Sequence, residues 1–278
     1  MGRSGHNTQL FALREPPPKE VLVGGQAYRL KKVFKHDFFA ATALYGAVDS
    51  GPSSDRLVVK FGRTQGFCGL PGAWVGRLLL RRERRFHKRA DGVEGIQRWA
   101  GQLDSTSYAL EYVEGQTLDV CGLPPGREGR FFDELRSILD SLHARGAAYC
   151  DLHKRSNIVV TPTGRPALID FQICALDKPH APWPWRRIVA AAVAYLQRMD
   201  LYHLYKHKRR LAPEHLRGEE QSLSRRRTPL LRLHRTLVTP LRRIRRAFLT
   251  HRHRAGRLVS PSEHLEDHNQ PEKATWRK

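Results

Sequence analysis

A polar loop that runs directly into a β-hairpin constrains this chain more than any other feature. The loop covers residues 151–157 and reads Asp-Leu-His-Lys-Arg-Ser-Asn. Two short apolar strands follow at 157–160 and 167–169, joined by a Pro-Thr-Gly-Arg turn. Asp170-Phe171 comes directly after the return strand, and a strand that ends in Lys60 lies earlier in the chain. This order of a lysine, a polar loop, a hairpin and an acid rarely arises by chance.

The hydrophobic pattern predicts an α+β chain, with strands mainly in the first half and helices mainly in the second. Apolar residues recur every three or four positions near 72–90, 129–145 and 186–204, which predicts three helices. Gly51-Pro52 marks a turn, and the strand pattern resumes after it. Strands are expected at 21–25, 28–34, 42–48, 56–61 and 108–113.

Several other classes of protein are excluded by the same pattern. The longest apolar run, 188–196, is too short to span a bilayer, which needs about 20 residues. Residues 1–18 lack the apolar segment of a secretory signal, and His6 does not fit a myristoylation motif. The four cysteines are far apart, which disfavours a disulfide scaffold or a structural zinc site. No cysteine or acidic cluster accompanies the closely spaced histidines, so they are expected at the surface and not as zinc ligands: His203, His207, His251 and His253. The chain is expected in the cytoplasm, either free or peripheral at the inner face of the membrane.

The ordered set of Lys60, Asp151, Asn157 and Asp170 resembles the protein-kinase-like superfamily over residues 25–205. Within it, the chain looks nearest to the bacterial lipopolysaccharide-core (heptose or Kdo) kinases and their RIO-like relatives. The resemblance implies a bilobal α+β fold. A small β-rich lobe would cover 20–114, a mainly helical lobe 115–205, and a basic helical tail 206–278.

The resemblance also implies ATP and Mg²⁺ as cofactors and a role for each motif residue. Lys60 would hold the α- and β-phosphates, and Glu83 on the following helix would position it. Asp151 would orient the acceptor hydroxyl, and Asn157 and Asp170 would be the metal ligands. A surface salt bridge is the alternative interpretation of Glu83, because four arginines surround it.

The loop that covers the phosphates in this superfamily departs from its usual pattern. No GxGxxG motif is present, and the corresponding position is 35–42, between two predicted strands. Ala40 and Ala41 are small enough for close backbone approach, and Thr42 offers a hydroxyl. Phe38 and Phe39 are residues that more often lie in a core or at a hairpin tip.

Three further assignments follow from the resemblance. Glu111 to Val113 would form the interlobe hinge, whose backbone binds the adenine. The lysine that steadies the γ-phosphate would fall at His153 or at Lys154, because the Asp-to-Asn spacing is six residues where five is usual. Asp200 would hold the backbone of the catalytic loop.

The chain also departs from the family pattern after the hairpin. Gln172 stands where a flexible glycine is usual, which indicates a fixed loop, and no Ala-Pro-Glu segment follows.

The formal net charge of +22 is concentrated near the C-terminus. Residues 206–258 contain 17 Lys and Arg against three acidic residues, so this segment carries +14. Two stretches, 228–238 and 239–249, each begin with Thr-Pro and predict a basic amphipathic helix. The pair would lie on an anionic membrane or pack on the helical lobe; nucleic acid is the least favoured partner, because no aromatic residues interleave with the arginines.

The sequence thus predicts a kinase that transfers the γ-phosphate of ATP to a hydroxyl. A sugar of the lipopolysaccharide core at the membrane face is the first choice of acceptor, and a protein Ser or Thr the second. A pseudokinase, a nucleotide-binding or scaffold module without turnover, is the alternative of another class. The sequence does not indicate the oligomeric state.

Overall fold

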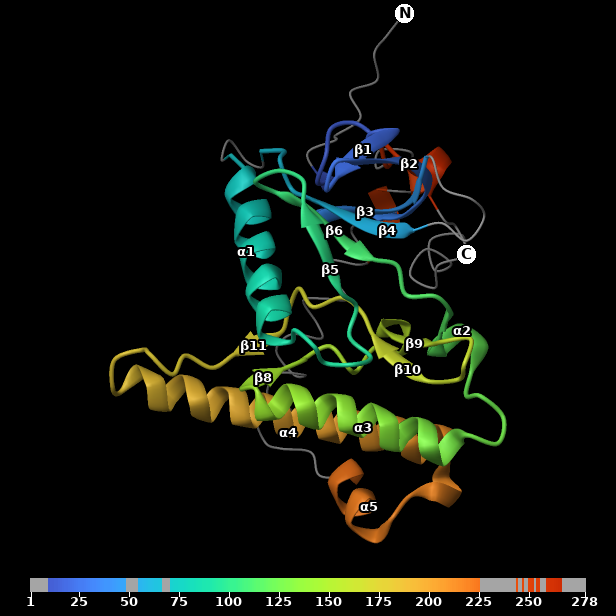
Figure 1. Cartoon of the computed structure of the whole chain (residues 1–278), viewed down its shortest axis with the longest axis vertical. Coiled ribbons are helices and arrows are strands. Elements are labelled where there is room, and N and C mark those ends of the chain that lie inside the picture. Colours follow the sequence, from blue (N-terminus) through green and yellow to red (C-terminus); the bar gives the residue numbers. More distant parts are fainter. Residues whose placement is uncertain are drawn as a thin grey trace, which may run out of the picture. The chain divides into compact units, whose positions relative to one another are not determined.

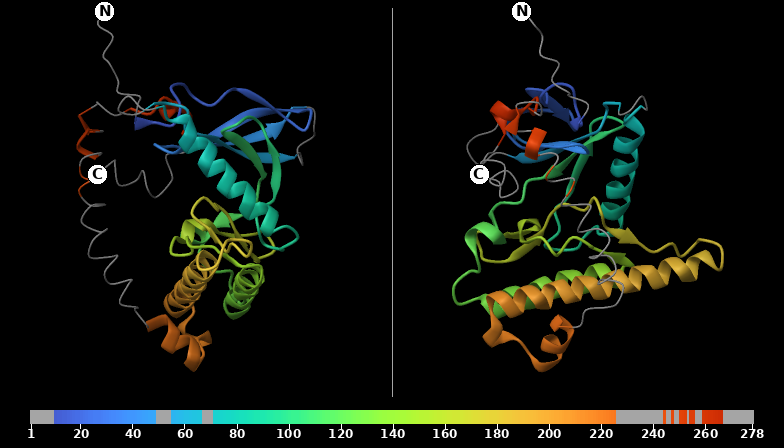
Figure 2. Two further views of the ribbon diagram at one scale, coloured as in Figure 1. Left: turned by 90° about the vertical axis from the view of Figure 1, so that its left-hand side faces the viewer. Right: turned by 180° about the vertical axis from the view of Figure 1, so that it is seen from behind.

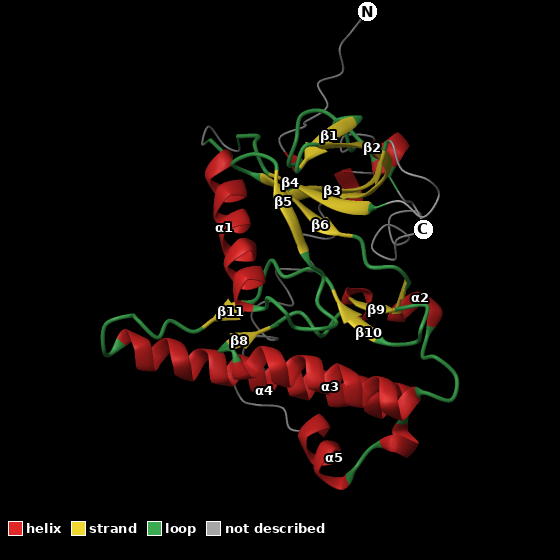
Figure 3. Ribbon diagram, viewed as in Figure 1, coloured by secondary structure: helices red, strands yellow, loops and turns green. Residues whose placement is uncertain are grey.

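The computed structural model describes residues 10–48, 55–66, 71–225 and 259–266, with residues 244, 247, 250–252, 254 and 255. The chain divides into two compact units. Unit 1 comprises 1–81, 99–112 and 227–278, and unit 2 comprises 82–98 and 113–226. Most strands belong to unit 1 and most helices to unit 2 (Figure 3), so the chain has the α+β composition that the sequence predicts.

Unit 1 is built on an antiparallel sheet with the strand order β1-β2-β3-β4-β6-β5 (Figure 1). Its strands are β1 (Glu20–Val23), β2 (Gln26–His36), β3 (Ala40–Ala47), β4 (Arg56–Gly62), β5 (Trp99–Gln102) and β6 (Ser107–Glu111). Each side chain of β3 is buried, and Val33, Tyr45, Val59 and Ala109 are fully buried in the core. Burial of both faces explains why β3 and β4 read as continuous apolar runs in the sequence. Helix α1 (Ala73–Arg89) starts in unit 1 and ends in unit 2.

A segment near the C-terminus, residues 259–266, belongs to unit 1. Glu266 forms a parallel bridge with Val33 in β2, and Leu265 packs against the core of the sheet. The fully buried Ser262 bonds to Nδ1 of His36 at 2.8 Å. The sequence pattern places these residues in a basic tail and does not predict this contact. The predicted helices 228–238 and 239–249 lie outside the described residues, apart from residues 244 and 247.

Unit 2 contains two long helices, α3 (Glu128–Ala144) and α4 (Trp185–Leu211), which lie antiparallel and side by side (Figures 1 and 2). Phe131, Leu135, Leu139 and Leu142 of α3 are buried at the three- and four-residue spacing that predicts this helix. Three short antiparallel strands lie over the pair, in the order β10 (Pro166–Leu168), β9 (Ile158–Val160) and β7 (Gln116–Thr117). The smaller elements are α2 (Leu118–Cys121), α5 (Gly218–Arg225) and the pair β8 (Ala147–Ala148) and β11 (Ala175–Leu176).

The predicted strands, helices and hairpin are confirmed, within a few residues at their ends. The elements β5, β7, β8, β11 and α2, which the pattern misses, have two to four residues, too few to show a period. The eight-residue helix α5 is also missed; only one of its side chains, that of Ser224, is buried, so no apolar stripe marks it. Helix α4 continues to Leu211, through the position where the sequence predicts the helical lobe to end. No helix within the described residues is long and apolar enough to cross a membrane.

Candidate active site

Lys60 lies inside β4, two residues before its end, and is 4% exposed, although a lysine near the end of a strand is usually solvated. Its cross-strand partners are Thr42 on β3 and Tyr108 on β6, and its ammonium lies 6.0 Å from the ring centroid of Tyr108. Thr42 is 7% exposed, and its buried Oγ1 has no hydrogen-bond partner within the described residues. The ammonium of Lys60 and the unsatisfied hydroxyl of Thr42 therefore belong to residues that lie directly opposite each other on neighbouring strands.

The turn that leads into β3 is tighter than the sequence predicts. Only residues 37–39 lie between β2 and β3, and the structure places Ala40 and Ala41 inside β3. The Asp37 carboxylate accepts hydrogen bonds from the backbone N–H groups of Phe39 at 2.8 Å and of Ala40 at 3.0 Å. The predicted phosphate-covering loop is therefore a short turn whose N–H groups already bind a carboxylate.

The predicted hinge coincides with the point where the chain passes between the units. Glu111 is the last residue of β6 and is exposed, and its cross-strand partner is Leu57. The unit boundary falls between Tyr112 and Val113. The backbone N–H of Tyr112 donates to the carbonyl of Arg56 at 2.9 Å. The role of Glu111 and Val113 in binding adenine stays a prediction.

Glu83 is fully buried on α1, which is incompatible with the alternative of a surface salt bridge. A buried carboxylate requires partners that offset the loss of its hydration. Its predicted pairing with Lys60 would join the two units, and it stays a prediction.

The loop around Asp151 is held by the long helix α4. Asp200 is 1% exposed, and its carboxylate accepts the backbone N–H groups of Tyr149 and Cys150, each at 2.8 Å. His143 of α3 lies 3.2 Å from the same carboxylate. Cys150 adopts a φ of 69°, which is uncommon for a residue with a side chain. The predicted role of Asp200 as the holder of the loop backbone is confirmed at the level of these hydrogen bonds.

The two carboxylate oxygens of Asp151 differ in their hydrogen bonding. Oδ2 accepts hydrogen bonds from Nδ2 of Asn157 at 2.8 Å and Nζ of Lys154 at 2.9 Å. Oδ1 lies 3.1 Å from Nδ1 of His153, but the geometry is not that of a hydrogen bond, and this buried oxygen has no other hydrogen-bond partner within the described residues. The family's γ-phosphate lysine is predicted to fall at position 153 or 154. The side chains of both residues, His153 and Lys154, contact Asp151, and only Lys154 supplies an ammonium there.

Asp170 follows β10 in the left-handed region, with a φ of 63°. Such a conformation costs about 1–3 kcal/mol, and it is found most often at functional sites. Tyr149 links this residue to the loop, because its hydroxyl donates to the carbonyl of Ile169. Burial raises the pKa of the Tyr149 hydroxyl well above its usual range, and the nearby charges of Asp170, Asp151 and Asp200 raise it further. The negative charges of Asp151 and Asp170 therefore both disfavour ionisation of the Tyr149 hydroxyl.

Phe171 anchors the segment after Asp170 in the core. Its ring is fully buried and stacks on Phe86 of α1, with centroids 4.4 Å apart. Two arginines of α1 hold the residues that follow. Arg82 donates to the carbonyls of Ile173 and Cys174, and Arg89 pairs with Asp177 at 2.7 Å. These contacts agree with the fixed loop that Gln172 predicts.

The expectation that the histidines near 203 and 251 lie at the surface is wrong for His207, which is buried in unit 2. His203 is half-buried, His251 is exposed, and residue 253 lies outside the described residues. His207 is 5% exposed and donates from Nε2 to the carbonyl of Leu152 at 2.8 Å. Burial lowers its pKa to about 4, and it lowers that of the half-buried His203 to about 3. The ring of His203 lies 5.8 Å from that of His153. The sequence offers one signal for the burial of these two histidines: both follow the apolar half of a predicted helix on which Asp200 also lies.

Each unit by itself contains residues whose chemistry suits one part of a nucleotide–metal complex, the phosphates in unit 1 and Mg²⁺ in unit 2. The unsatisfied Thr42 Oγ1 beside Lys60 offers a donor to a phosphate oxygen. Asn157 and Asp170 supply an amide and a carboxylate, and Mg²⁺ is commonly held by one or two such ligands together with substrate phosphates. No cluster of three or more His, Cys, Asp or Glu that would make a metal site by itself occurs in the part of the chain that the structure describes.

No protein-family model matches the chain, and no curated protein matches it. A solved structure that resembles it is the complex of Rio2 kinase with ADP/Mg²⁺ and phosphoaspartate from Chaetomium thermophilum. The TM-score is 0.42 and the identity 13% over 61% of this chain. The chain covers 55% of the length of that protein. We rest no residue role on a likeness of this level.

Proposed function

We propose that this protein is an ATP- and Mg²⁺-dependent phosphotransferase with a protein-kinase-like fold. The observation that carries the proposal is the state of Asp151. Its Oδ2 is fixed by Asn157 and Lys154, while its buried Oδ1 accepts no hydrogen bond within the described residues and lies 3.1 Å from Nδ1 of His153. We infer that Oδ1 is the atom that accepts the acceptor hydroxyl. A carboxylate held in this way can orient an acceptor hydroxyl and accept its proton.

The remaining residues supply charge and position. Lys60 and Thr42 would hold phosphate oxygens, and Glu83 would position Lys60. Asn157 and Asp170 would hold the metal, which neutralises developing negative charge on the transferred group. Lys154 restrains Asp151, with Nζ 2.9 Å from Oδ2, and it would contact the γ-phosphate. Backbone groups near Glu111 and Val113 would bind the adenine. The acceptor that we favour is a sugar hydroxyl of the lipopolysaccharide core, with a protein Ser or Thr second.

The turn at Asp37 favours a second candidate, a pseudokinase that binds nucleotide without turnover. The N–H groups of Phe39 and Ala40 already bind the Asp37 carboxylate, and a carboxylate at this position would repel a phosphate. The two candidates share the fold and differ in whether a phosphoryl group is transferred.

A transfer assay separates them. The full chain is given γ-labelled ATP and Mg²⁺ with a lipopolysaccharide-core sugar, casein, or water as the acceptor. We expect label on the sugar, and the isosteric Asp151→Asn variant should lose about 10²–10⁴-fold in rate. Asp119→Asn, which alters an acid on α2, is the control and should keep the wild-type rate. Equal turnover by Asp151→Asn overturns the mechanism. An ADP-induced rise in the unfolding temperature without any transfer identifies a pseudokinase.

A further inference from the structure

The first half of α4 exposes apolar side chains that the rest of the described chain does not cover. Trp183, just before the helix, is 66% exposed, and Trp185 and Ile188 are 63% and 55% exposed. Between residues 185 and 194 only Val193 is buried. Figures 1 and 2 show why: α4 extends past the end of α3, so this part of the helix has no antiparallel neighbour.

This exposure is unusual for the sequence concerned. Residues 188–196 form the longest apolar run of the chain, and such runs are ordinarily buried. Single exposed apolar residues are common on protein surfaces, but three large ones within six positions form a patch that indicates an interaction site. We refer to residues 183–194 as the α4 docking surface.

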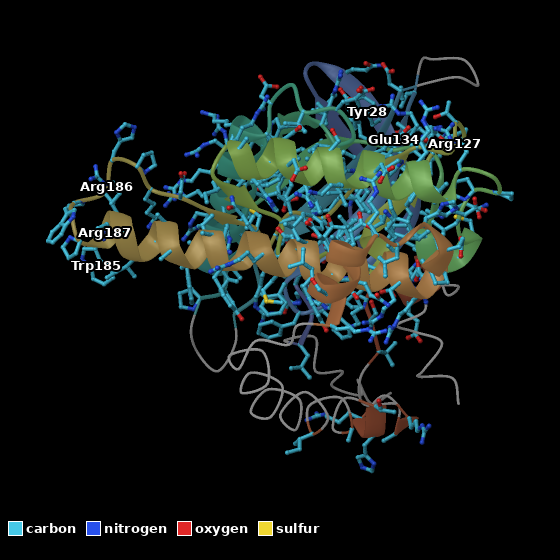
Figure 4. The ribbon with its side chains drawn as sticks, turned by 90° about the horizontal axis from the view of Figure 1, so that it is seen from below. Tyr28, Arg127, Glu134, Trp185, Arg186 and Arg187 are labelled. Carbon is cyan, nitrogen blue, oxygen red and sulfur yellow. The ribbon has the colours of Figure 1, made fainter. Side chains whose placement is uncertain are left out.

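The charge around the α4 docking surface has one sign. Arg186 and Arg187 are exposed beside Trp185 (Figure 4), and Lys178 and His180 are exposed in the preceding loop. No acidic residue occurs from 178 to 199. The guanidinium of Arg187 lies 6.0 Å from the ring centroid of Trp183. Cations and indole rings are therefore interleaved in one surface.

The position of the two arginines gives a second argument for an anionic partner. They lie in the first turn of α4, which has no acidic residue and no side-chain cap. The helix dipole disfavours cations at this end. An anion bound at the surface would offset this unfavourable interaction.

We propose that the α4 docking surface binds an anionic phospholipid membrane. Tryptophan favours the boundary between headgroups and acyl chains, and arginine can place its stem in the apolar layer while its charge reaches the phosphates. Anionic lipid adds attraction of about 1 kcal/mol for each basic residue near the surface. A second copy of the chain fits less well, because a twofold contact would bring the arginines of both copies together.

Vesicle binding by the full chain tests the proposal. Phosphatidylcholine vesicles with and without phosphatidylglycerol are titrated, and the bound fraction is measured by co-sedimentation. We expect binding only to the anionic vesicles, and the Trp183→Ser/Trp185→Ser variant should bind at least about tenfold more weakly. The control variant Leu22→Ser/Val120→Ser alters two residues of equal exposure elsewhere, at 69% and 65%, and should bind as the wild type does.

A second pair of variants tests the charge. Arg186→Gln/Arg187→Gln should weaken binding and reduce its dependence on salt, whereas Arg81→Gln/Arg85→Gln, on exposed positions of α1, should do neither. Unchanged vesicle binding by the tryptophan variant, or no binding by the wild type, overturns the proposal. A wild-type dimer in light scattering that the tryptophan variant loses would assign the surface to a second copy instead. None of these results depends on whether the protein transfers phosphate.

Discussion

Oδ1 of Asp200 lies 2.8 Å from the backbone nitrogen of Cys150 and accepts its hydrogen bond. The partners are 50 residues apart in the sequence. Because Asp200 lies in the middle of the 27-residue helix α4, its hydrogen bonds fix the backbone of the loop that carries Asp151 to this helix. Cys150 in this loop has an uncommon backbone conformation, and such a residue persists only where the surrounding structure over-determines it.

Replacing Asp200 should damage both stability and activity. Asp200→Ala leaves two buried N–H groups unsatisfied, and it should lower the free energy of unfolding by about 2–5 kcal/mol. The matched control is Asp140→Ala on α3, where the carboxylate is half exposed and forms an i,i+4 pair with Arg136. This pair should contribute less than about 1 kcal/mol. Urea unfolding of both variants measures the difference, and equal losses would contradict the anchoring role.

Replacing Thr42 should have opposite effects on stability and on nucleotide binding. The Thr42 hydroxyl is buried without a partner, so Thr42→Val should raise the free energy of unfolding by about 1 kcal/mol. If the hydroxyl donates to a phosphate, the same variant should bind ADP more weakly in calorimetry. Thr106→Val is the control, because the buried Thr106 hydroxyl donates to Asp104, and its loss should be destabilising. A fall in stability of Thr42→Val would show that its hydroxyl is satisfied.

Stability should fall in mild acid because of His207. Its folded pKa of about 4 lies below the unfolded value of about 6.5, so the unfolded chain binds a proton first as the pH falls. The contribution of His207 to the free energy of unfolding is complete above pH ~6.5 and is lost toward pH ~4. Between these values the free energy of unfolding should fall by about 1.4 kcal/mol for each pH unit. His207→Gln should flatten this slope in unfolding experiments across the range, whereas His180→Gln, at an exposed position, should not. Parallel curves for wild type and His207→Gln would contradict the assignment.

The C-terminal segment should stabilise the sheet of unit 1. Nε2 of His36 accepts the backbone N–H of Leu13 at 3.0 Å, so its Nδ1 carries the hydrogen that Ser262 accepts. Ser262→Ala removes this buried hydrogen bond and should cost about 1–3 kcal/mol. The exposed Ser222→Ala should change the free energy of unfolding by less than about 0.5 kcal/mol. A result for Ser262→Ala as small as that for Ser222→Ala would rule out a structural role for the segment.

The helices and strands that carry the candidate site could be predicted because their residues repeat at a regular spacing. Leu135, Leu139 and Leu142 mark the buried face of α3, and the Pro-Thr-Gly-Arg turn fixes the hairpin between Asn157 and Asp170. The order of the motif residues indicated which polar side chains to examine. The hydrophobic pattern predicts a longer loop at 35–42 than the structure has, because it does not take account of the Asp37 carboxylate, which binds the backbone N–H groups two and three residues ahead.

The sequence by itself determined the α+β order of elements and the candidate set of Lys60, Asp151, Asn157 and Asp170, since periodicity and motif order are properties of neighbouring residues. Only the tertiary structure decided that His207 is neutral and buried, that Ser262 closes a hydrogen bond on the sheet, and that the apolar start of α4 is exposed. Each of these depends on which distant segment covers a side chain. Burial sets the free energy of a charge, an unpaired donor or an apolar surface, and burial is a property of the folded chain.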